Sequence, residues 1–288
     1  MLTTKFLKNM NTNEEIKEMV KLKYSEIALQ DQATNDSSCC GSGGCSTEVY
    51  NIMSDEYDHL GGYTSDADLK LGCGLPTEFA KIQPGNVVVD LGSGAGNDCF
   101  VARHETGESG KVIGVDFTEA MVDKARINAE KLGFNNVEFR LGDIEKLPIT
   151  ANVADVVVSN CVMNLVPDKP KAFGEVFRIM KSGGHFSISD IVLTGDLPEK
   201  IKNAAEMYAG CVASAILKDE YLQIIKDAGF TNIRLQKEKP IIVPNDILKN
   251  YLSEEEMKIY NSKPNIIFSI TVYAEKLANS CSPEAGCC

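Results

Sequence analysis

The 288-residue sequence has no apolar run approaching the roughly 20 residues that a membrane-spanning helix requires. Positive charge is also scarce, because 29 lysines and arginines stand against 41 aspartates and glutamates, for a net charge of −12. Nucleic-acid phosphates are bound by basic faces, so this balance disfavours a nucleic-acid partner. The first ten residues are too short and too polar for the apolar region of a signal peptide. We therefore expect a cytoplasmic protein that binds neither membrane nor nucleic acid.

Other patterns are missing as well. The three histidines, His59, His104 and His185, belong to no catalytic or metal-binding motif. We find no internal repeat and no heptad pattern, and the latter favours a monomer. Structural zinc sites usually pair their cysteines as Cys-x-x-Cys, a spacing that the well-separated cysteines of this chain do not have.

What the sequence does have is ten cysteines. In a chain that is neither small nor exported, clustered thiols are more often ligands, nucleophiles or redox pairs than structural disulfides. Cys73, Cys161 and Cys211 stand far apart, each in a short apolar or glycine-rich context. Cys99 falls inside a predicted helix, where we expect it to be a packing residue. The other six lie toward the ends of the chain: Cys39, Cys40, Cys45, Cys281, Cys287 and Cys288.

Apolar runs alternate with helical segments through the middle of the chain, a pattern typical of a parallel sheet covered on both faces. The expected strands there are residues 86–91, 111–116, 137–141, 154–159 and 185–192. The expected helices are residues 97–105, 119–132 and 170–180, the last closed by residues 182–184. An amphipathic helix is predicted over residues 12–30, where Thr12 and Glu15 form a capping-box pattern. Later in the chain we expect helices at 198–215 and 218–228 and strands at 231–237 and 268–276, the final strand antiparallel.

These elements predict an α/β protein with a seven-stranded, mostly parallel, Rossmann-like sheet. Residues 1–79 would form an N-terminal helix, a cysteine-rich loop and a cover over the substrate site. Residues 80–192 would form the cofactor-binding core. Residues 193–278 would add a helix carrying Cys211, the final strands and a small lobe inserted at 238–265, and residues 279–288 a flexible cysteine-rich tail.

Residues 90–96, DLGSGAG, place three glycines at every second position between a predicted strand and helix. Such a loop turns tightly and lets a cofactor approach backbone N–H groups at the start of the helix. The dinucleotide fingerprint spaces its glycines differently, as G-x-G-x-x-G. An acidic residue before G-x-G-x-G is the arrangement of methyltransferases that use S-adenosylmethionine (SAM). We therefore assign Asp90, Gly92, Gly94 and Gly96 to a SAM site.

Two further carboxylates follow the next two strands. Asp116 ends the second strand and is suited to accept hydrogen bonds from ribose hydroxyls. Asp143 follows the third strand and is suited to meet the adenine amino group, with Ile144 against the ring. Ligands of open α/β sheets bind at the carboxyl ends of the strands, which is where these residues fall. The predicted cofactor site also includes Phe117, Met121 and Asn160.

The separated cysteines have two interpretations. Cys161 directly follows the fourth strand, whose end faces the reactive methyl group in this fold, and it stands where N-methyltransferases usually place a Pro-Pro-aromatic segment. Cys73 precedes the core and Cys211 follows the fifth strand, so all three thiols can converge and bind a soft substrate. Alternatively they are small apolar fillers, because free cysteine is among the most buried residue types.

Four segments make the sequence resemble the arsenite methyltransferases: residues 68–76 (DLKLGCGLP), 90–96, 114–118 (GVDFT) and 159–168 (SNCVMNLVPD). The resemblance runs from about residue 50 to 244, and Cys211 falls at the family's third arsenic-binding cysteine. The family usually has Glu before that cysteine and Gly after it, whereas this chain has Gly210 and Val212. The short C-terminal part also matches poorly.

The resemblance implies methyl transfer from SAM to As(III) held by Cys73, Cys161 and Cys211, which would serve arsenic detoxification. It further implies that arsenic arrives as As(III) or as a thiol conjugate, with glutathione or thioredoxin as the reductant. Cys39, Cys40, Cys45, Cys287 and Cys288 are possible auxiliary arsenic ligands or surface thiols without a role in turnover. Two rival hypotheses stay open at this stage: a small-molecule C- or O-methyltransferase with structural cysteines, and a non-catalytic metalloid-binding protein.

Overall fold

The computed structural model describes residues 12–29, 53, 55–202, 211–212, 214–262 and 265–278. The tail predicted at 279–288 lies outside the described residues. The six cysteines near the two ends of the chain also lie outside them: Cys39, Cys40, Cys45, Cys281, Cys287 and Cys288.

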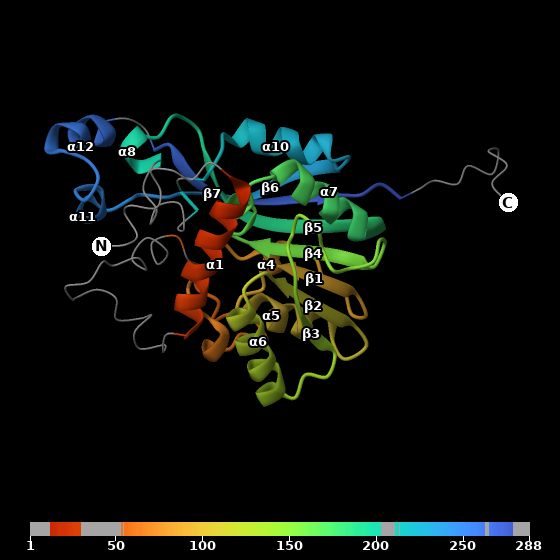
Figure 1. Ribbon diagram of the computed structural model, residues 1–288. Coiled ribbons are helices and arrows are strands. Elements are labelled where there is room, and N and C mark those ends of the chain that lie inside the picture. Colours follow the sequence, from red (N-terminus) through yellow and green to blue (C-terminus); the bar gives the residue numbers. More distant parts are fainter. Residues whose placement is uncertain are drawn as a thin grey trace, which may run out of the picture.

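One seven-stranded sheet, in the order β3-β2-β1-β4-β5-β7-β6, organises the described part of the chain (Figure 1). The first five strands pair in parallel, and β7 runs antiparallel to both β5 and β6. This topology confirms the predicted mostly parallel sheet with an antiparallel final strand. The strands are β1 (Val87–Leu91), β2 (Lys111–Asp116), β3 (Val137–Leu141), β4 (Ala154–Asn160), β5 (Met180–Leu193), β6 (Thr231–Pro240) and β7 (Ile267–Glu275).

Apolar packing on both faces of the sheet explains why its inner strands are continuously hydrophobic. Val88 and Val89 are neighbours in β1 yet belong to different buried clusters, because successive side chains of a strand point to opposite faces. One cluster includes Phe100 of α5 and the other Phe173 of α7. The helices are α1 (Asn13–Leu29), α4 (Pro76–Phe79), α5 (Asn97–Thr106), α6 (Glu119–Leu132), α7 (Lys169–Ile179), α8 (Glu199–Lys202), α10 (Lys218–Asp227), α11 (Asn245–Leu248) and α12 (Glu254–Asn261).

Several helix ends follow from local sequence. Thr12 and Glu15 form the predicted capping box at α1, with reciprocal side-chain to backbone bonds of 3.2 and 3.3 Å. Asp168 caps α7 by accepting a hydrogen bond from the backbone N–H of Lys171. Gly133 ends α6 in the left-handed conformation that glycine adopts without a steric penalty.

A third buried cluster lies beyond the carboxyl ends of β4 and β5 and holds Cys73, Cys161 and Cys211. Its other members include residues of α1, of α8, of the end of β5, of the start of β7 and of the segment between β6 and β7 that contains α11. This cluster therefore joins parts of the chain that are far apart in sequence. It places the three thiols outside the two cores that cover the sheet.

Two predicted elements differ from the structure in extent. Of the helix expected at 198–215, residues 203–210 and 213 lie outside the described residues. Residues 199–202 form α8, and Cys211 lies in a turn with φ of 61°, which no α-helix contains. Apolar spacing suggested a helix there, but spacing does not report a residue held in the left-handed region. The fifth strand begins at Met180 rather than His185, so residues 182–184 lie within β5 because Ala154 of β4 already pairs with Met180.

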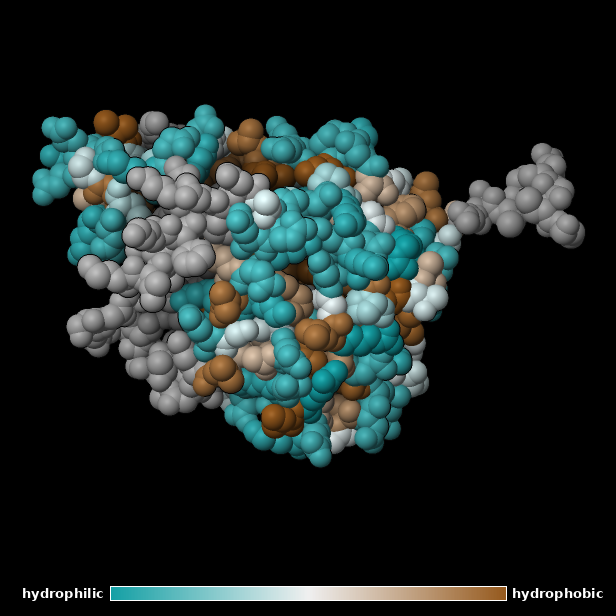
Figure 2. All heavy atoms as spheres, viewed as in Figure 1, coloured by the Kyte–Doolittle hydropathy of each residue, from teal (hydrophilic) through white to brown (hydrophobic). Residues whose placement is uncertain are grey.

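The surface carries no broad apolar patch on the face shown in Figure 2, where brown side chains are scattered among hydrophilic ones. Within the described residues, none of the helices has both the length and the apolarity needed to cross a membrane.

Candidate active site

A pocket opens at the carboxyl ends of β1 to β4. It is lined by the glycine loop after β1, by the ends of the neighbouring strands and by α1. The predicted cofactor residues that line it are Asp90, Gly92, Gly94, Asp116, Phe117, Met121, Asp143, Ile144 and Asn160. Cys161 lines the same pocket.

Gly96 is the exception among the predicted cofactor residues, because it does not belong to this lining. Its φ is 103°, and a Cβ added there would approach the Phe100 ring to 2.8 Å. Gly96 therefore permits the turn into α5 and its close packing. The prediction that it contacts the cofactor directly is not supported by its position.

Asp116 organises the cofactor loop from the end of β2. One carboxylate oxygen accepts the Gly94 N–H at 3.0 Å and the other accepts the Thr118 N–H at 2.8 Å. Burial raises the pKa of Asp116, while these backbone bonds oppose that rise. A Cβ at Gly94 would meet no protein atom within 4 Å, so the backbone at this point borders open space.

Asp90 is fully enclosed at the end of β1. Its Oδ2 accepts a hydrogen bond from the thiol of Cys99 at 3.2 Å. Burial, followed by the charge of nearby Asp98, raises the pKa of Asp90 well above its usual range. Cys99 is packed in the sheet core as expected, but it also holds Asp90.

Asp143 has a partner that the sequence did not indicate. Lys17 of α1 donates to Asp143 Oδ2 and to Glu145 Oε2, both at 2.7 Å. Burial alone would lower the pKa of Lys17, but the hydrogen bonds to the two carboxylates raise it. Lys17, Val20 and Tyr24 all line the pocket, so α1 forms one of its walls.

The loop that carries Cys73 is fastened to the end of β4 by Asn160. Asn160 Oδ1 accepts the Cys73 N–H at 3.0 Å, and its Nδ2 donates to the Gly74 carbonyl at 2.8 Å. The glycines that flank Cys73 allow this approach. A Cβ at Gly72 would come within 2.6 Å of Asn160, and one at Gly74 within 2.6 Å of Ser189 on β5.

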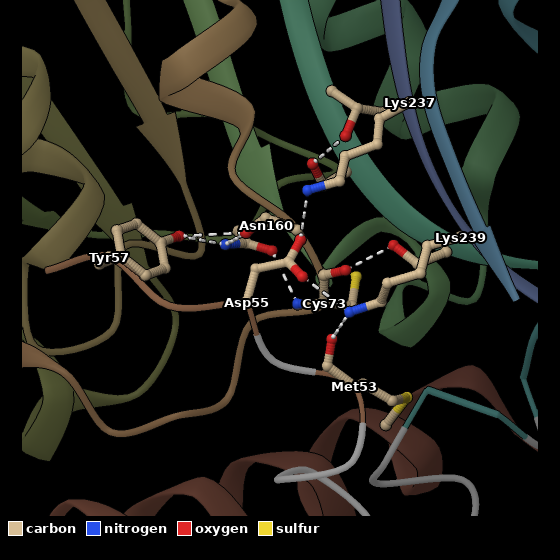
Figure 3. A network of polar contacts seen from close by, with 11 residues as sticks. Met53, Asp55, Tyr57, Cys73, Asn160, Lys237 and Lys239 are labelled. Carbon is tan, nitrogen blue, oxygen red and sulfur yellow. Dashed lines mark hydrogen bonds and ion pairs between the residues drawn. The ribbon is translucent and has the colours of Figure 1, made fainter. Parts of the chain in front are cut away.

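Asn160 is in turn held by a buried network (Figure 3). Its Nδ2 also lies 2.5 Å from the hydroxyl of Tyr57 and 3.2 Å from Asp98 Oδ2. Burial raises the pKa of Asp98 to about 6, although Tyr57 and Asn160 both hydrogen bond to the ionised form. The sequence offered no sign of this network, because its members are separated by at least one structural element.

The segment leading to Tyr57 is tied to the edge strand. Asp55 Oδ2 accepts a hydrogen bond from Lys237 Nζ at 2.9 Å, and Asp55 Oδ1 accepts one from Lys239 Nζ at 2.7 Å, both lysines being on β6. Figure 3 shows Asp55 between these two lysines. Burial alone would raise the pKa of Asp55, but the two lysines outweigh it and lower the pKa. Lys239 also donates to the Met53 carbonyl at 3.2 Å. The edge of the sheet therefore anchors the chain that approaches the Cys73 loop.

The three predicted thiols lie together and are buried, each exposing 3% or less of its surface. Cys73 Sγ and Cys161 Sγ lie within 4.8 Å of each other, whereas Cys211 Sγ is not within 4.8 Å of both. Cys161 and Cys211 both have positive φ values, 60° and 61°, which cost a non-glycine residue about 1–3 kcal/mol each. Hydrogen bonds from Cys161 N–H to Ser189 O at 2.8 Å and from Cys211 Sγ to Cys161 O at 2.9 Å accompany this backbone.

Burial sets the protonation of these thiols. It raises the pKa of Cys73, and it raises that of Cys161 well above the usual range, with the Cys211 and Cys73 thiols adding to the effect. Both thiols are therefore protonated at neutral pH. The site holds them as neutral groups ready to exchange with a ligand.

Asp190 is the main site residue that the sequence did not reveal. It lies on β5, and one of its oxygens, Cys73 Sγ and Cys161 Sγ are all within 4.8 Å of one another. Tyr221 of α10 donates to Asp190 Oδ2 at 3.1 Å. Burial raises the pKa of Asp190 to about 7, and the charge of nearby Lys169 works against that rise. Asp190 lies within an apolar strand, so the sequence pattern indicated only a core position there.

The pocket fits SAM by the chemistry of its lining. Five aspartates face it, with Lys17 as the lysine among its lining residues, and SAM carries a cationic sulfonium and an ammonium. Buried side-chain oxygens of Ser93, Asn97 and Thr118 also line the pocket without a protein hydrogen-bond partner. Unpaired buried polar atoms of this kind are usually satisfied by a ligand or water.

Comparisons with known proteins agree with this geometry. Residues 82–229 match the family model of a methyltransferase domain. The chain is 39% identical to an arsenite methyltransferase of Halobacterium salinarum, over 84% of this chain and 62% of that protein. It is 30% identical to an arsenite methyltransferase of Aquipseudomonas alcaligenes, over 82% of this chain and 68% of that protein.

The chain is also similar to a solved structure. That structure is of an arsenic(III) S-adenosylmethionine methyltransferase from Chlamydomonas reinhardtii, with a TM-score of 0.61 and 31% identity over 72% of this chain and 68% of that chain. Fold and pocket together define a class I SAM-dependent methyltransferase fold. Within that class, the chain belongs to the arsenite methyltransferase family. It spans 62% of the length of the Halobacterium relative.

Proposed function

We propose that this protein transfers the methyl group of SAM to As(III) held by Cys73, Cys161 and Cys211. The observation that carries the proposal is the placement of the three buried thiols, of which Cys161 also lines the cofactor pocket. Three soft sulfur donors in one buried cluster suit a thiophilic, three-coordinate centre. The names of the related proteins support the same substrate.

Neutral thiols suit the loading of arsenic into a buried site. Each thiol replaces one hydroxyl of arsenous acid, forming an As–S bond while the thiol proton leaves with the hydroxyl as water. The product, three thiolates around As(III), carries no net charge and avoids the cost of burying an ion. A thiol conjugate of As(III) would exchange in the same way and release its own thiol.

Asp90, Asp116 and Asp143 would hold the cofactor, together with the loop backbone at Gly92 and Gly94. When bound, SAM supplies an electrophilic methyl carbon. The thiols keep arsenic pyramidal, which leaves a lone pair on arsenic as the nucleophile. Asn160 contacts both the Cys73 loop and the pocket, so it fixes the position of the thiols relative to the cofactor.

We infer that the activity serves arsenic detoxification, that glutathione or thioredoxin returns the site to its reduced state, and that the protein acts as a monomer. Free thiols at Cys73, Cys99, Cys161 and Cys211 favour a reducing compartment such as the cytoplasm.

The test is a methylation assay with purified full-length protein, SAM, arsenite and a thiol reductant. We expect methylated arsenicals to form and S-adenosylhomocysteine to accumulate in equal amounts. Tight arsenite binding without turnover would instead identify a non-catalytic metalloid-binding protein. Methylation of an organic substrate that is unchanged in a Cys161→Ser variant would identify a small-molecule methyltransferase.

A further inference from the structure

A second ligand set lies in the thiol cluster beside the one proposed for arsenic. It consists of Cys73, Cys161 and Asp190, whose donor atoms are mutually within 4.8 Å. All three residues are buried. Cys211 is not part of this set, although its thiol contacts Cys161.

We propose that Cys73, Cys161 and Asp190 form a binding site for a thiophilic divalent cation such as Zn²⁺ or Cd²⁺. Two sulfurs and one carboxylate oxygen are a donor set that these ions accept, with the fourth tetrahedral position left to water. Such a site differs from structural zinc sites because its ligands come from separate segments rather than from a Cys-x-x-Cys pair.

Charge balance supports a divalent cation. Two thiols release their protons to solvent as the cation binds, and the resulting two thiolates neutralise its charge of two. The carboxylate of Asp190 is compensated by Lys169, which is buried nearby and whose ammonium donates to the carbonyls of Asn164 and Val166 at 3.1 and 3.3 Å. The filled site therefore has no net charge, as a low-dielectric interior requires.

The carboxylate is already oriented for this role. Asp190 Oδ1 accepts the Ile191 N–H at 3.0 Å and Oδ2 accepts the Tyr221 hydroxyl at 3.1 Å. Hydrogen bonds of this kind commonly fix the orientation of metal-binding carboxylates. As(III) needs no such oxygen donor, because three thiols complete its coordination. Asp190 is therefore needed only for the divalent cation, and Cys211 only for As(III).

The experiment is a titration of reduced, full-length protein with Cd²⁺, followed through the ultraviolet absorption of newly formed cadmium–thiolate bonds. All variants carry serine at the six cysteines near the chain ends, which would otherwise bind the probe: Cys39, Cys40, Cys45, Cys281, Cys287 and Cys288. Zn²⁺ is then tested by its ability to displace Cd²⁺. Arsenite binding is measured on the same proteins, with Asp246→Asn on the exposed α11 as the matched control.

We expect one Cd²⁺ per chain and opposite responses from two variants. Asp190→Asn should weaken Cd²⁺ binding by about tenfold or more and change arsenite affinity by less than about threefold. Cys211→Ser should weaken arsenite binding strongly and leave Cd²⁺ affinity within about threefold of the parent. Cd²⁺ should also compete with arsenite, a part of the expectation that rests on the proposed function.

The proposal is overturned if the parent protein binds no Cd²⁺ or if Asp190→Asn binds it as tightly as the parent does. Should Asp190→Asn fail to fold, as judged by circular dichroism, Cys211→Ser decides, because equal losses of cadmium and arsenite affinity would contradict two distinct ligand sets. Loss of methylation with Cd²⁺ binding intact would count against the proposed function alone.

Discussion

The cofactor half of the pocket and its thiol half differ in how far apart their residues lie along the chain. The cofactor half consists of the predicted cofactor residues between Asp90 and Ile144, which lie at or just after the carboxyl ends of three neighbouring parallel strands, β1, β2 and β3. The thiol half joins Cys73, Cys161, Asp190 and Cys211, which come from separate loops and strands. Strand order alone brings the first set together, whereas the second depends on long-range packing and on two residues with positive φ.

The two halves should therefore respond differently when one of their residues is substituted. A residue of the cofactor half acts largely through its own contact with the ligand. A residue of the thiol half contributes to binding through its own contact and also by holding the other thiols in position. Substitutions in the two halves should therefore separate loss of cofactor binding from loss of arsenite binding.

The largest effect is expected at Cys161, which belongs to both halves. In Cys161→Ser the soft sulfur is replaced by an oxygen that As(III) binds poorly, so arsenite methylation should fall by about a thousandfold. Cofactor binding, measured by calorimetry with S-adenosylhomocysteine, should change by less than about threefold. Cys99→Ser is the matched control, because its hydroxyl can still donate to Asp90. Equal losses of methylation in the two variants would show that the replacement of any buried cysteine, and not the loss of an arsenic ligand, lowers activity.

Asp116→Ala should affect the other half. Its removal frees the N–H groups of Gly94 and Thr118 and takes away the predicted ribose contact, so cofactor affinity should fall by about a hundredfold. Arsenite binding in the absence of cofactor should be nearly unchanged. A comparable loss of arsenite affinity would contradict the independence of the two halves.

Asp190 should make the stability of the thiol half depend on pH. Its pKa is about 7 in the folded protein against an ordinary value of 3.8, so the folded state binds the proton more tightly than the unfolded state does. Stability is therefore lost as pH rises from about 4 to about 7 and then levels off. Relative to the parent, Asp190→Asn should gain about 2 kcal/mol in free energy of unfolding across that range, since the unpaired Lys169 offsets part of the gain. Denaturant unfolding of both proteins at a series of pH values measures this gain. A difference in free energy of unfolding that does not change with pH would contradict the prediction.

Asn160→Ala should break the link between the halves. It removes the bonds to Cys73 N–H and to the Gly74 carbonyl and leaves buried groups unpaired, so the free energy of unfolding should fall by about 1–3 kcal/mol. Arsenite affinity should fall more than cofactor affinity, because the Cys73 loop loses its anchor. Asn164→Ala, which removes another buried amide, is the control for stability alone. Loss of cofactor affinity without loss of arsenite affinity would place Asn160 in the cofactor half only.

Lys17→Ala should have the smallest effect. The ion pairs with Asp143 and Glu145 are partly exposed, and such pairs contribute about 1 kcal/mol or less, so cofactor affinity should weaken by less than about fivefold. Lys21→Ala, on the same helix but outside the pocket lining, should leave affinity unchanged. Tighter cofactor binding in Lys17→Ala would mean that Lys17 competes with the cofactor for Asp143.

Much of the cofactor half could be predicted because its signals are local. The glycine loop, Asp116 and Asp143 each follow a recognisable strand, and the parallel sheet places strand ends side by side. Lys17 escaped prediction because it reaches the pocket from α1, more than a hundred residues away in sequence. The helix expected around Cys211 was wrong because apolar spacing carries no information about a left-handed residue.

By itself, the sequence determined the sheet, its two covered faces and the order of the cofactor residues, because alternating apolar strands and helices allow few arrangements. It also marked Cys73, Cys161 and Cys211 as unusual. Tertiary packing gathers the three thiols in one buried cluster, places Asp190 beside Cys73 and Cys161, and lets Asn160 join the Cys73 loop to β4. Those contacts arise from packing between distant segments, and their geometry exists only once the chain has folded.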